Sequence, residues 1–348
     1  MIVLGVETTC DETAVSVVRD GRDILSAVTA TQMVHAEFGG VVPEVAARAH
    51  LETLPALHEK ALSESGIPED AIEGVAVAAG PGLLGALLVG VSWAKGYARA
   101  RGLPAIGVSH LEGHLFANRL AYPDLEPPFV ALVVSGGHTL LAWVREWGDY
   151  VGLGQTRDDA CGEAFDKVAK LLGLVYPGGP AVSLAADRGR PDAIRFPRGM
   201  RRQANFDFSY SGLKTAVALH VSAHPKLDLA ERADIAASFQ EAAVEILVEK
   251  SLLACAQLGV SRLAVGGGVA ANRRLRELLV DAERKRSIEA FYPPPALCTD
   301  NAAMIAAVGD FYLSLGACSG PGLAAVAVWP LWPAGKVFPW ADPSRKLD

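Results

Sequence analysis

Two histidines one helical turn apart carry the clearest chemical signal in this sequence. Ser109 and Glu112 form an S-x-x-E capping box, which predicts that a helix begins here. His110 and His114 would then lie on one face of that helix, with about 5–6 Å between their Cβ atoms. Together with Asp300, far along the chain, they would make an N/N/O metal site with positions open for a substrate. The alternative is a pair of ordinary histidines at a helix start, and the spacing alone does not separate the two.

Four glycine clusters predict turns where the backbone can approach an anion, because glycine adopts positive φ and leaves its amide uncovered. They are Gly80-Pro81-Gly82, Gly136-Gly137, Gly178-Gly179 and Gly266-Gly267-Gly268. The last cluster follows a predicted strand and precedes a predicted helix, a layout that can hold a phosphate or nucleoside at the helix N-terminus. Asn272 lies just after it and could either hold a ribose or phosphate or cap the helix, and the sequence leaves both roles open.

Charged residues gather at a few places along the chain. Asp11 and Glu12 lie in the turn of a hairpin whose strands read as buried, so a purely solvating role is unexpected. Two basic runs stand out in a chain of net charge −7, the first followed by aromatic residues. We interpret them as RNA contacts, with solvated surface charge as the alternative. The runs are Arg195, Arg198, Arg201 and Arg202, then Arg273, Arg274, Arg276, Arg284, Lys285 and Arg286.

The bulk properties predict a globular protein of about two domains. The 348 residues are 51% hydrophobic, enough for a large core. Five cysteines without C-x-x-C spacing favour a reducing compartment. The first residues lack the basic region of a signal peptide, and the most apolar run, 83–94, is shorter than the roughly 20 residues that a spanning helix needs. We therefore expect a cytoplasmic protein with no membrane partner.

The elements that position these residues read as alternating strands and helices, which predicts an α/β fold. Residues 2–18 and 129–144 both read as strand, turn, strand, and this likeness suggests a duplicated domain, with a boundary near 122–128. The remaining expected elements are helices 43–65, 83–101, 162–173, 232–258, 271–285 and 301–315, and strands 74–79 and 261–265.

Eight motifs, in order from about residue 2 to 310, together resemble the TsaD family, once labelled O-sialoglycoprotein endopeptidase. They are GVETTCDETAVSVV, HAEFGGVVPEVAARAH, SHLEGHLFA, VVSGGHTLL, DDACGEAFDKVAKLLGLVYPGGP, SYSGLKT, GGGVAANRRLR and CTDNAAMIA. The resemblance implies a two-lobed actin/Hsp70/sugar-kinase (ASKHA) fold with duplicated RNase H-like domains. Residues 1–127 with 299–330 would form the N-terminal lobe, 128–298 the C-terminal lobe and 331–348 a surface tail.

The resemblance also implies an activity. The family transfers the threonylcarbamoyl group of threonylcarbamoyl-AMP to N6 of adenosine 37 in tRNAs that read codons beginning with A, forming t6A and AMP. The implied partners are tRNA, TsaB-like and TsaE-like subunits, and a TsaC-like enzyme that supplies the acyl-adenylate.

Site residues are implied in the same way. His110, His114 and Asp300 would bind one divalent metal ion, Fe²⁺ or alternatively Zn²⁺, as a Lewis acid that polarises the reacting carbonyl. Asp11 and Glu12 match residues that the family places near the reacting carbonyl, and our own hypothesis is that one of them assists proton removal from N6. The nucleotide, as threonylcarbamoyl-AMP, ATP or AMP, would contact Val133, Val134, Ser135, Gly136, Gly137, Asp166, Gly179 and Asn272.

Three other functions compete with this expectation. A metallopeptidase of the HExxH type is disfavoured because Glu112 stands one place too late, two residues and so about 200° around the helix from His110. An ATPase or sugar kinase of the same fold would hold Mg²⁺ through carboxylates and phosphates rather than paired histidines. A non-enzymatic scaffold resembling TsaB would lack both the H-x-x-x-H spacing and the Pro-Gly-Gly turn.

Overall fold

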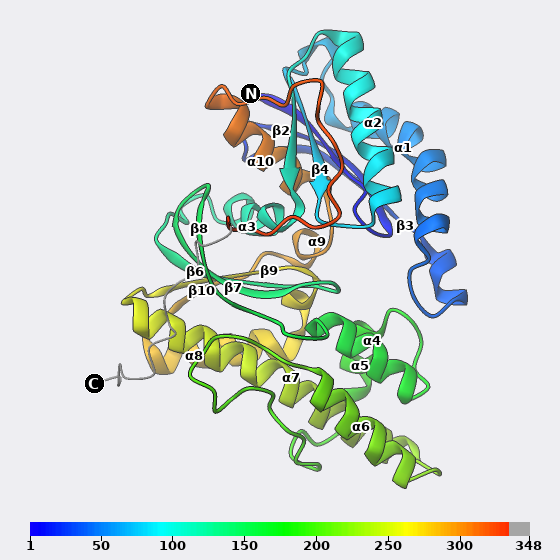
Figure 1. The fold of residues 1–348 in the computed structure, drawn as a ribbon, viewed down its shortest axis with the longest axis vertical. Coiled ribbons are helices and arrows are strands. Elements are labelled where there is room, and N and C mark those ends of the chain that lie inside the picture. The colour runs from blue at the N-terminus through cyan, green and yellow to red at the C-terminus, as the bar shows by residue number, and fades with distance from the viewer. Residues whose placement is uncertain (334–348) are drawn as a thin grey trace. The chain divides into compact units, whose positions relative to one another are not determined.

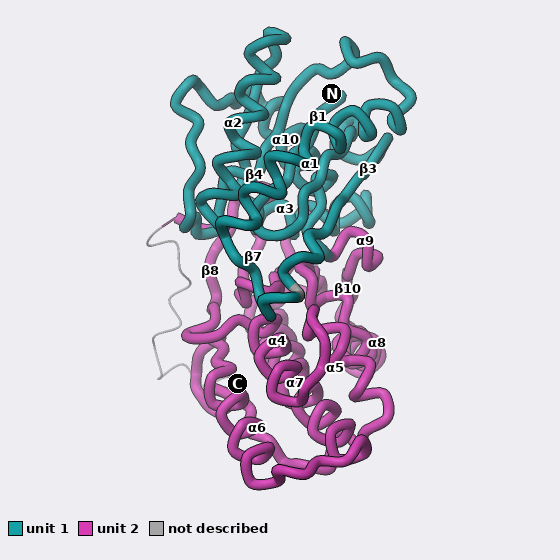
Figure 2. The backbone as a smooth tube through the Cα atoms, turned by 90° about the vertical axis from the view of Figure 1, so that its right-hand side faces the viewer, with its two compact units in different colours: residues 1–125, 299–331 teal, residues 126–298, 332–348 magenta. Residues whose placement is uncertain are grey.

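The structure, a computed structural model, describes residues 1–333 of the chain (Figure 1). These residues form two compact units, coloured separately in Figure 2. Unit 1 consists of Met1–Leu125 and Thr299–Leu331, and unit 2 of Glu126–Cys298 with residues 332–333. The surface tail expected at 331–348 lies outside the described residues from 334 onward.

Unit 1 is built on a five-stranded sheet in the order β3-β2-β1-β4-β5. The first three strands pair antiparallel, whereas β4 and β5 run parallel to β1. Its strands are β1 (Ile2–Glu7), β2 (Glu12–Arg19), β3 (Asp23–Thr31), β4 (Gly74–Gly80) and β5 (Ala105–Ser109). Its helices are η1 (Met33–Glu37), α1 (Pro43–Ser65), η2 (Glu69–Ala71), α2 (Leu84–Arg101), α3 (His110–Ala121) and α10 (Ala302–Ser314).

Helices cover both faces of the unit 1 sheet, and the close fit of α10 is set by a glycine. Leu4 of β1 packs in one core cluster with Leu54 of α1. Gly5, its neighbour, faces the other side of the sheet, where a Cβ would lie only 2.2 Å from the Ala302 carbonyl oxygen of α10. Glycine at this position therefore lets α10 lie directly on β1. This packing also sets the position of the residues just before α10, among them Asp300.

Unit 2 repeats the plan with a sheet in the order β10-β9-β6-β7-β8. Here β6, β7 and β8 pair antiparallel, and β9 and β10 run parallel to β6. The core beside the sheet includes Phe165 and Phe239, whose rings lie 5.0 Å apart. Its strands are β6 (Phe129–Val134), β7 (Thr139–Glu146), β8 (Asp149–Gln155), β9 (Arg262–Gly266) and β10 (Glu289–Phe291). Its helices are α4 (Cys161–Leu171), α5 (Gly178–Ala186), α6 (Ser211–Ala223), α7 (Leu229–Leu258), η3 (Gly268–Ala271), α8 (Arg273–Arg286) and α9 (Pro295–Cys298).

The shared strand layout confirms the duplication expected from the two hairpins. The expected helices and strands are all present, with ends that differ by a few residues at most. The sequence did not indicate β3, β5, β8, β10, α5, α6 or α9. α5 opens with Gly178-Gly179-Pro180, residues that weaken a helical pattern, so this cluster is a helix start rather than a free loop. Within residues 1–333, no helix is both long enough and apolar enough to cross a membrane.

Candidate functional site

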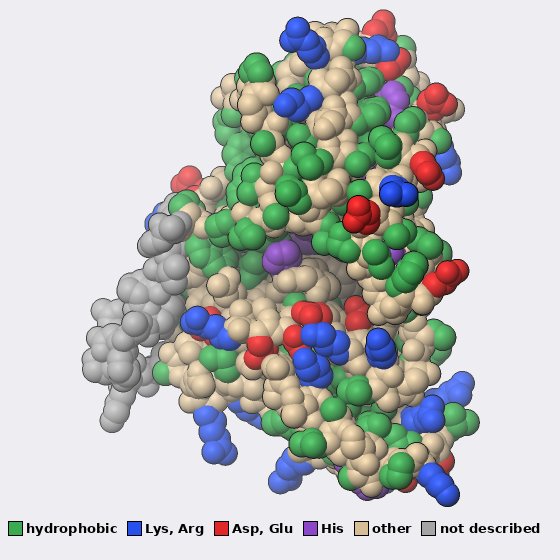
Figure 3. Space-filling view, turned by 45° about the vertical axis from the view of Figure 1, so that its right-hand side comes forward, with side chains coloured by type: hydrophobic (Ala, Val, Ile, Leu, Met, Phe, Trp, Pro, Cys, Tyr) green, Lys and Arg blue, Asp and Glu red, His purple; other side chains and the backbone are tan. Residues whose placement is uncertain are grey.

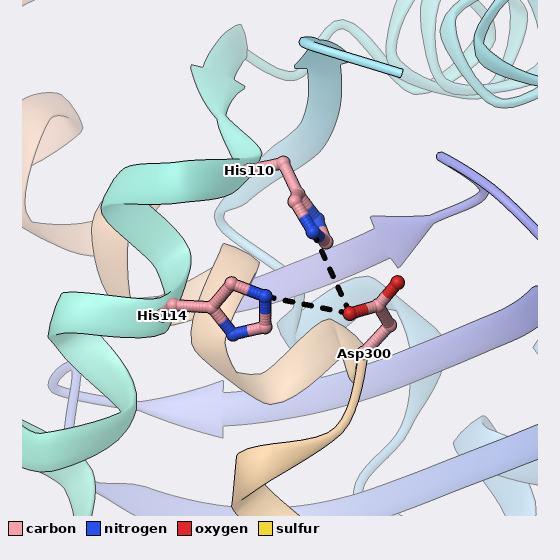
Figure 4. Close-up of side chains that lie close together, drawn as sticks. All are labelled: His110, His114 and Asp300. Atoms are coloured by element: carbon pink, nitrogen blue, oxygen red, sulfur yellow. Dashed lines mark ion pairs between the residues drawn. The ribbon is translucent and has the colours of Figure 1, made fainter. Parts of the chain in front are cut away.

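Three of the predicted site residues converge within unit 1 (Figure 4). The Asp300 Oδ1 atom lies 3.5 Å from His110 Nε2 and 3.4 Å from His114 Nε2. The two imidazole rings have centroids 4.6 Å apart and stand nearly perpendicular, so their nitrogens point at one place from two directions. His110 and His114 are buried, and Asp300 is mostly so.

These separations are informative because they are longer than ordinary N–H···O hydrogen bonds. Ligand atoms about 2.0–2.2 Å from an ion, at angles near 90–110°, lie about 2.8–3.6 Å from one another. His114 Nε2, the nitrogen that faces Asp300, makes no hydrogen bond within the part of the chain that the structure describes. The arrangement of the three side chains therefore fits a shared cation.

The start of α3 differs from the expected capping box. The helix does begin at His110, but Ser109 makes no side-chain cap hydrogen bond. Ser109 is the last residue of β5, which runs straight into the helix, so no turn brings its hydroxyl over the first amides. Glu112 instead accepts a hydrogen bond of 2.8 Å from the Tyr312 hydroxyl of α10. Glu112 is thus committed to helix packing, which argues against a peptidase base at this position.

A carboxylate that the sequence did not single out orients His110. Glu7 Oε2 lies 2.8 Å from His110 Nδ1, and Thr9 Oγ1 lies 3.3 Å from the same nitrogen. Glu7 is fully buried and also accepts a hydrogen bond of 2.6 Å from the Thr9 amide. A carboxylate on Nδ1 keeps the proton there and leaves Nε2 free as a ligand, which is the usual outer partner of a metal-binding histidine.

The electrostatics of this part of unit 1 favour a positive charge. Burial opposes protonation of His110, but the carboxylates of Asp300 and Glu7 outweigh it and raise the pKa of His110 to about 9. Burial lowers the pKa of His114. Burial, with the nearby Asp300 and Asp11, raises the pKa of Glu12 to about 10. Buried carboxylates that lie close together repel one another, and a bound cation would offset this repulsion.

The glycine turns of unit 2 gather at the ends of two parallel strands. Because β6 and β9 run parallel, their carboxyl ends meet at one edge of the sheet. A Cβ on Gly162, in the first turn of α4, would lie 2.6 Å from the Ser135 carbonyl oxygen. A Cβ on Gly267 would lie 2.4 Å from the Val134 carbonyl oxygen. Glycine at both positions therefore allows the turns to pack against one another.

Other glycines at this edge face open space. No heavy atom of the described residues lies within 4 Å of where a Cβ would stand on Gly136, Gly137, Gly179 or Gly268. Uncovered backbone of this kind, at helix starts and strand ends, is what an anionic ligand can approach. Gly136, Gly137 and Gly179 are therefore the members of the predicted nucleotide-contacting set with room for a ligand, and Gly268, which was not in that set, offers room as well.

The other predicted nucleotide contacts already have structural roles. Val133 and Val134 are buried in β6, so only their backbone could face a ligand. Asp166 accepts a hydrogen bond of 2.8 Å from the Gly178 amide at the start of α5. Asn272 caps α8 through the Leu275 amide and donates to Gln240 at 2.8 Å, so its capping role is the one that the structure displays. Ser135 accepts from the His138 amide within its turn.

Half of the first basic run is neutralised by acidic residues of α7. Arg198 pairs with Glu245 at 2.7 Å, and Arg201 pairs with Glu245 and Glu249. Arg195 and Arg202 are exposed and make no ion pair within residues 1–333, and they line a surface hollow of about 900 Å³. The face drawn in Figure 3 likewise shows basic side chains in small groups with acidic ones among them. In the second run, three residues form ion pairs: Arg273, Arg274 and Lys285. Arg276 donates a hydrogen bond to the Pro293 carbonyl oxygen.

Comparison with known proteins gives two results. A family model described as "TsaD: tRNA N6-adenosine threonylcarbamoyltransferase" matches residues 23–307. A protein of that same description from Geobacter sp. (strain M21) is 54% identical over 332 residues, 95% of this chain and 97% of the relative.

Solved structures share the fold at low identity. Full-length HypF, in a phosphate- and nucleotide-bound form, is 14% identical with a TM-score of 0.60 over 90% of this chain and 46% of that one. The activator of a 2-hydroxyisocaproyl-CoA dehydratase from Clostridium difficile is 16% identical with a TM-score of 0.51, covering 91% of this chain and 97% of that one. These likenesses, together with the duplicated sheets, confirm the ASKHA fold.

Proposed function

This chain belongs to the TsaD family of tRNA N6-adenosine threonylcarbamoyltransferases, and from this premise we propose which of its residues carry out the transfer. The reaction attaches a threonylcarbamoyl group to N6 of an adenosine in tRNA and forms t6A. The observation that carries the proposal is the convergence of His110, His114 and Asp300 on one point in unit 1. The acceptor is proposed to be adenosine 37 of tRNAs that read codons beginning with A.

We propose that these three side chains hold one divalent metal ion. Two imidazole nitrogens and one carboxylate oxygen are a donor set that Fe²⁺ and Zn²⁺ both accept, and we propose Fe²⁺. When bound, such an ion supplies a Lewis acid beside the carbonyl that is attacked. Glu7 fixes the ring of His110 through Nδ1, and Thr9 steadies both residues. Metal analysis of anaerobically purified protein tests the assignment, and zinc as the sole tightly held metal would contradict the choice of iron.

The donor is proposed to be threonylcarbamoyl-AMP, whose adenylate part lies on the open glycines of unit 2. The mixed anhydride is already activated, so the chain must position it and stabilise the charge of the departing phosphate. Gly136, Gly137 and Gly268 leave room for a ligand beside their backbone, and amides there would suit that charge. The start of α5 at Gly179 adds a helix N-terminus of the same kind.

Alanine at Gly137 or Gly268 will weaken donor binding without unfolding the protein. Neither glycine has a positive φ or a neighbour within 4 Å of an added Cβ, so the free protein accommodates alanine. In the complex the methyl group takes up ligand space, at a cost of about 1–3 kcal/mol, or roughly 5- to 150-fold in KM for the donor. Gly96→Ala is the matched control, since its position on α2 is equally open. Unchanged KM values in both turn variants, with unchanged thermal midpoints, would contradict the assignment.

The tRNA is proposed to contact unit 2 through the two unpaired arginines of the first basic run. Arg195→Ala/Arg202→Ala will weaken tRNA binding and lower the slope of log affinity against log salt by about 2, because each removes one phosphate contact. Filter binding at several salt concentrations measures this. Arg22→Ala, an exposed arginine of unit 1, serves as the control. An unchanged salt slope would place the RNA elsewhere.

A TsaB-like subunit is proposed to pack on α1 and α2. Leu87 and Val91 of α2 are core residues and are unsuited to a test of this surface. Leu84 and Leu88 lie one turn apart on α2 and are 50% and 48% exposed, and Leu51 of α1 is 67% exposed. Leu84→Asp/Leu88→Asp will abolish co-purification with a TsaB-like protein, whereas Leu219→Asp, at a leucine of α6 that is 67% exposed, will not. Retained co-purification in the double variant would exclude this surface.

A further inference from the structure

A second pair of histidines, absent from the site described above, is buried in unit 1. His50 of α1 and His35 of η1 are both fully buried. His50 Nε2 lies 3.0 Å from the Cys10 carbonyl oxygen, and His50 Nδ1 lies 2.8 Å from Thr13 Oγ1. A neutral imidazole with its proton on Nε2 satisfies both contacts, since it donates to the carbonyl and accepts from the hydroxyl. Burial lowers the pKa of His50, which agrees with the neutral form.

Gln32 connects the two histidines. His35 Nε2 lies 2.9 Å from Gln32 Oε1, and the Val42 amide donates to His35 Nδ1 at 3.3 Å. The Gln32 Nε2 group lies 3.3 Å from both the Ala46 carbonyl oxygen and His50 Nδ1. Every donor therefore meets an acceptor when both histidines are neutral and carry the proton on Nε2. A buried network with all its partners satisfied is rigid.

This network ends on the turn that carries Asp11 and Glu12. Three successive carbonyl oxygens of the turn accept hydrogen bonds: Thr9 from the Leu83 amide at 2.9 Å, Cys10 from His50 at 3.0 Å, and Asp11 from the Gln32 amide at 3.0 Å. Among these three contacts, the one at Cys10 comes from a side chain. It can therefore be removed by substitution without altering the backbone.

The turn brings acidic groups together in a buried place, so its geometry must be held by other parts of unit 1. Burial and the nearby Asp300, Asp11 and Glu7 raise the pKa of Glu12. We propose that His50, held in one tautomer by Thr13 and by the Gln32–His35 pair, is a positioning residue that aims the Asp11–Glu12 turn for the transfer reaction. The inference rests on the proposed role of Asp11 and Glu12 in proton removal. A displacement of about 1 Å at a catalytic group can cost about 100-fold in rate.

Two substitutions at His50 separate positioning from simple packing. His50→Gln places an amide N–H where Nε2 stands and keeps the donor to Cys10. His50→Asn is of similar polarity but reaches only as far as Nδ1, so that donor is lost. The assay uses the full chain with tRNA and its partner proteins, and it records kcat, the KM for tRNA, metal content and the thermal midpoint.

We expect His50→Gln to retain kcat within about threefold and His50→Asn to lose about 10- to 100-fold, with KM for tRNA and metal content alike in the two. Equal kcat values in two folded, metal-loaded variants would overturn the proposal. If His50→Asn does not fold, Thr13→Val, which removes the hydroxyl that fixes the tautomer, must lower kcat, and an unchanged kcat overturns the proposal in the same way.

Asp11→Asn and Glu12→Gln are measured alongside. If both leave kcat unchanged, the proposed function of the turn has failed; if either lowers it while the His50 variants match, the positioning role alone has failed.

Discussion

His114→Ala will lose both the bound metal and the transfer activity while keeping its fold. The ring is buried and His114 Nδ1 has no partner within residues 1–333, so its removal breaks no hydrogen-bond network of the protein. It does remove one of three ligand atoms. Loss of an outer partner of a metal ligand costs about 10- to 100-fold in affinity, and loss of a ligand itself must cost more than about 100-fold. Anaerobic titration with Fe²⁺ or Co²⁺, alongside the transfer assay, measures both effects.

Substitutions at Glu7 and Glu112, two acidic residues near the histidines, allow graded losses of metal affinity to be compared. Glu7→Gln keeps the volume of the side chain but removes the charge that holds the Nδ1 proton of His110, so its metal affinity should fall by about 10- to 100-fold. Glu112→Gln lies on the same helix as the histidines but hydrogen-bonds to Tyr312, so metal affinity and transfer should change little. Full metal occupancy in His114→Ala, or loss of activity in Glu112→Gln equal to that in His114→Ala, would contradict the assigned site.

The sequence predicted the parts of this site that depend on local spacing. The H-x-x-x-H pattern requires only that residues 110–121 form a helix, and the structure has that helix. Asp300 joins the pair because Gly5 lets α10 lie on β1, and that contact spans most of the chain. Spacing alone therefore left Asp300 as one carboxylate among many, and the resemblance of the whole motif set identified it.

The sequence failed where a side chain's role depends on a distant partner. Glu7 and His110 are far apart in the chain, and so are His50 and Cys10, so neither contact leaves a local pattern. The expected capping box at Ser109 is wrong for a related reason: a strand precedes the helix without a turn. The first basic run was interpreted without sight of the α7 carboxylates, which engage half of its arginines.

Asp11→Asn will lower kcat by about 10²- to 10⁴-fold, the usual contribution of a positioned general base. N6 of adenine is a weak nucleophile, because its lone pair is delocalised into the ring, so it must lose a proton as the new bond forms. Burial and the surrounding carboxylates raise the pKa of Glu12 to about 10, which favours its protonated form. We therefore propose Asp11, which is hydrogen-bonded to Glu12, as the proton acceptor.

Glu12→Gln is the informative companion, since glutamine imitates the protonated form of glutamate. We expect it to lose less than about tenfold in kcat, with KM for tRNA and donor near the values of the unsubstituted protein in both variants. Glu37→Gln, an exposed carboxylate in the segment after β3, is the control for a general loss of negative charge. Rapid-mixing transfer assays with metal-loaded protein distinguish the outcomes. A large loss of kcat in Glu12→Gln, with little loss in Asp11→Asn, would exchange the two roles. Full activity in both variants would show that the turn takes no part in proton transfer. Orientation of the substrates would then be the chain's main contribution to the rate.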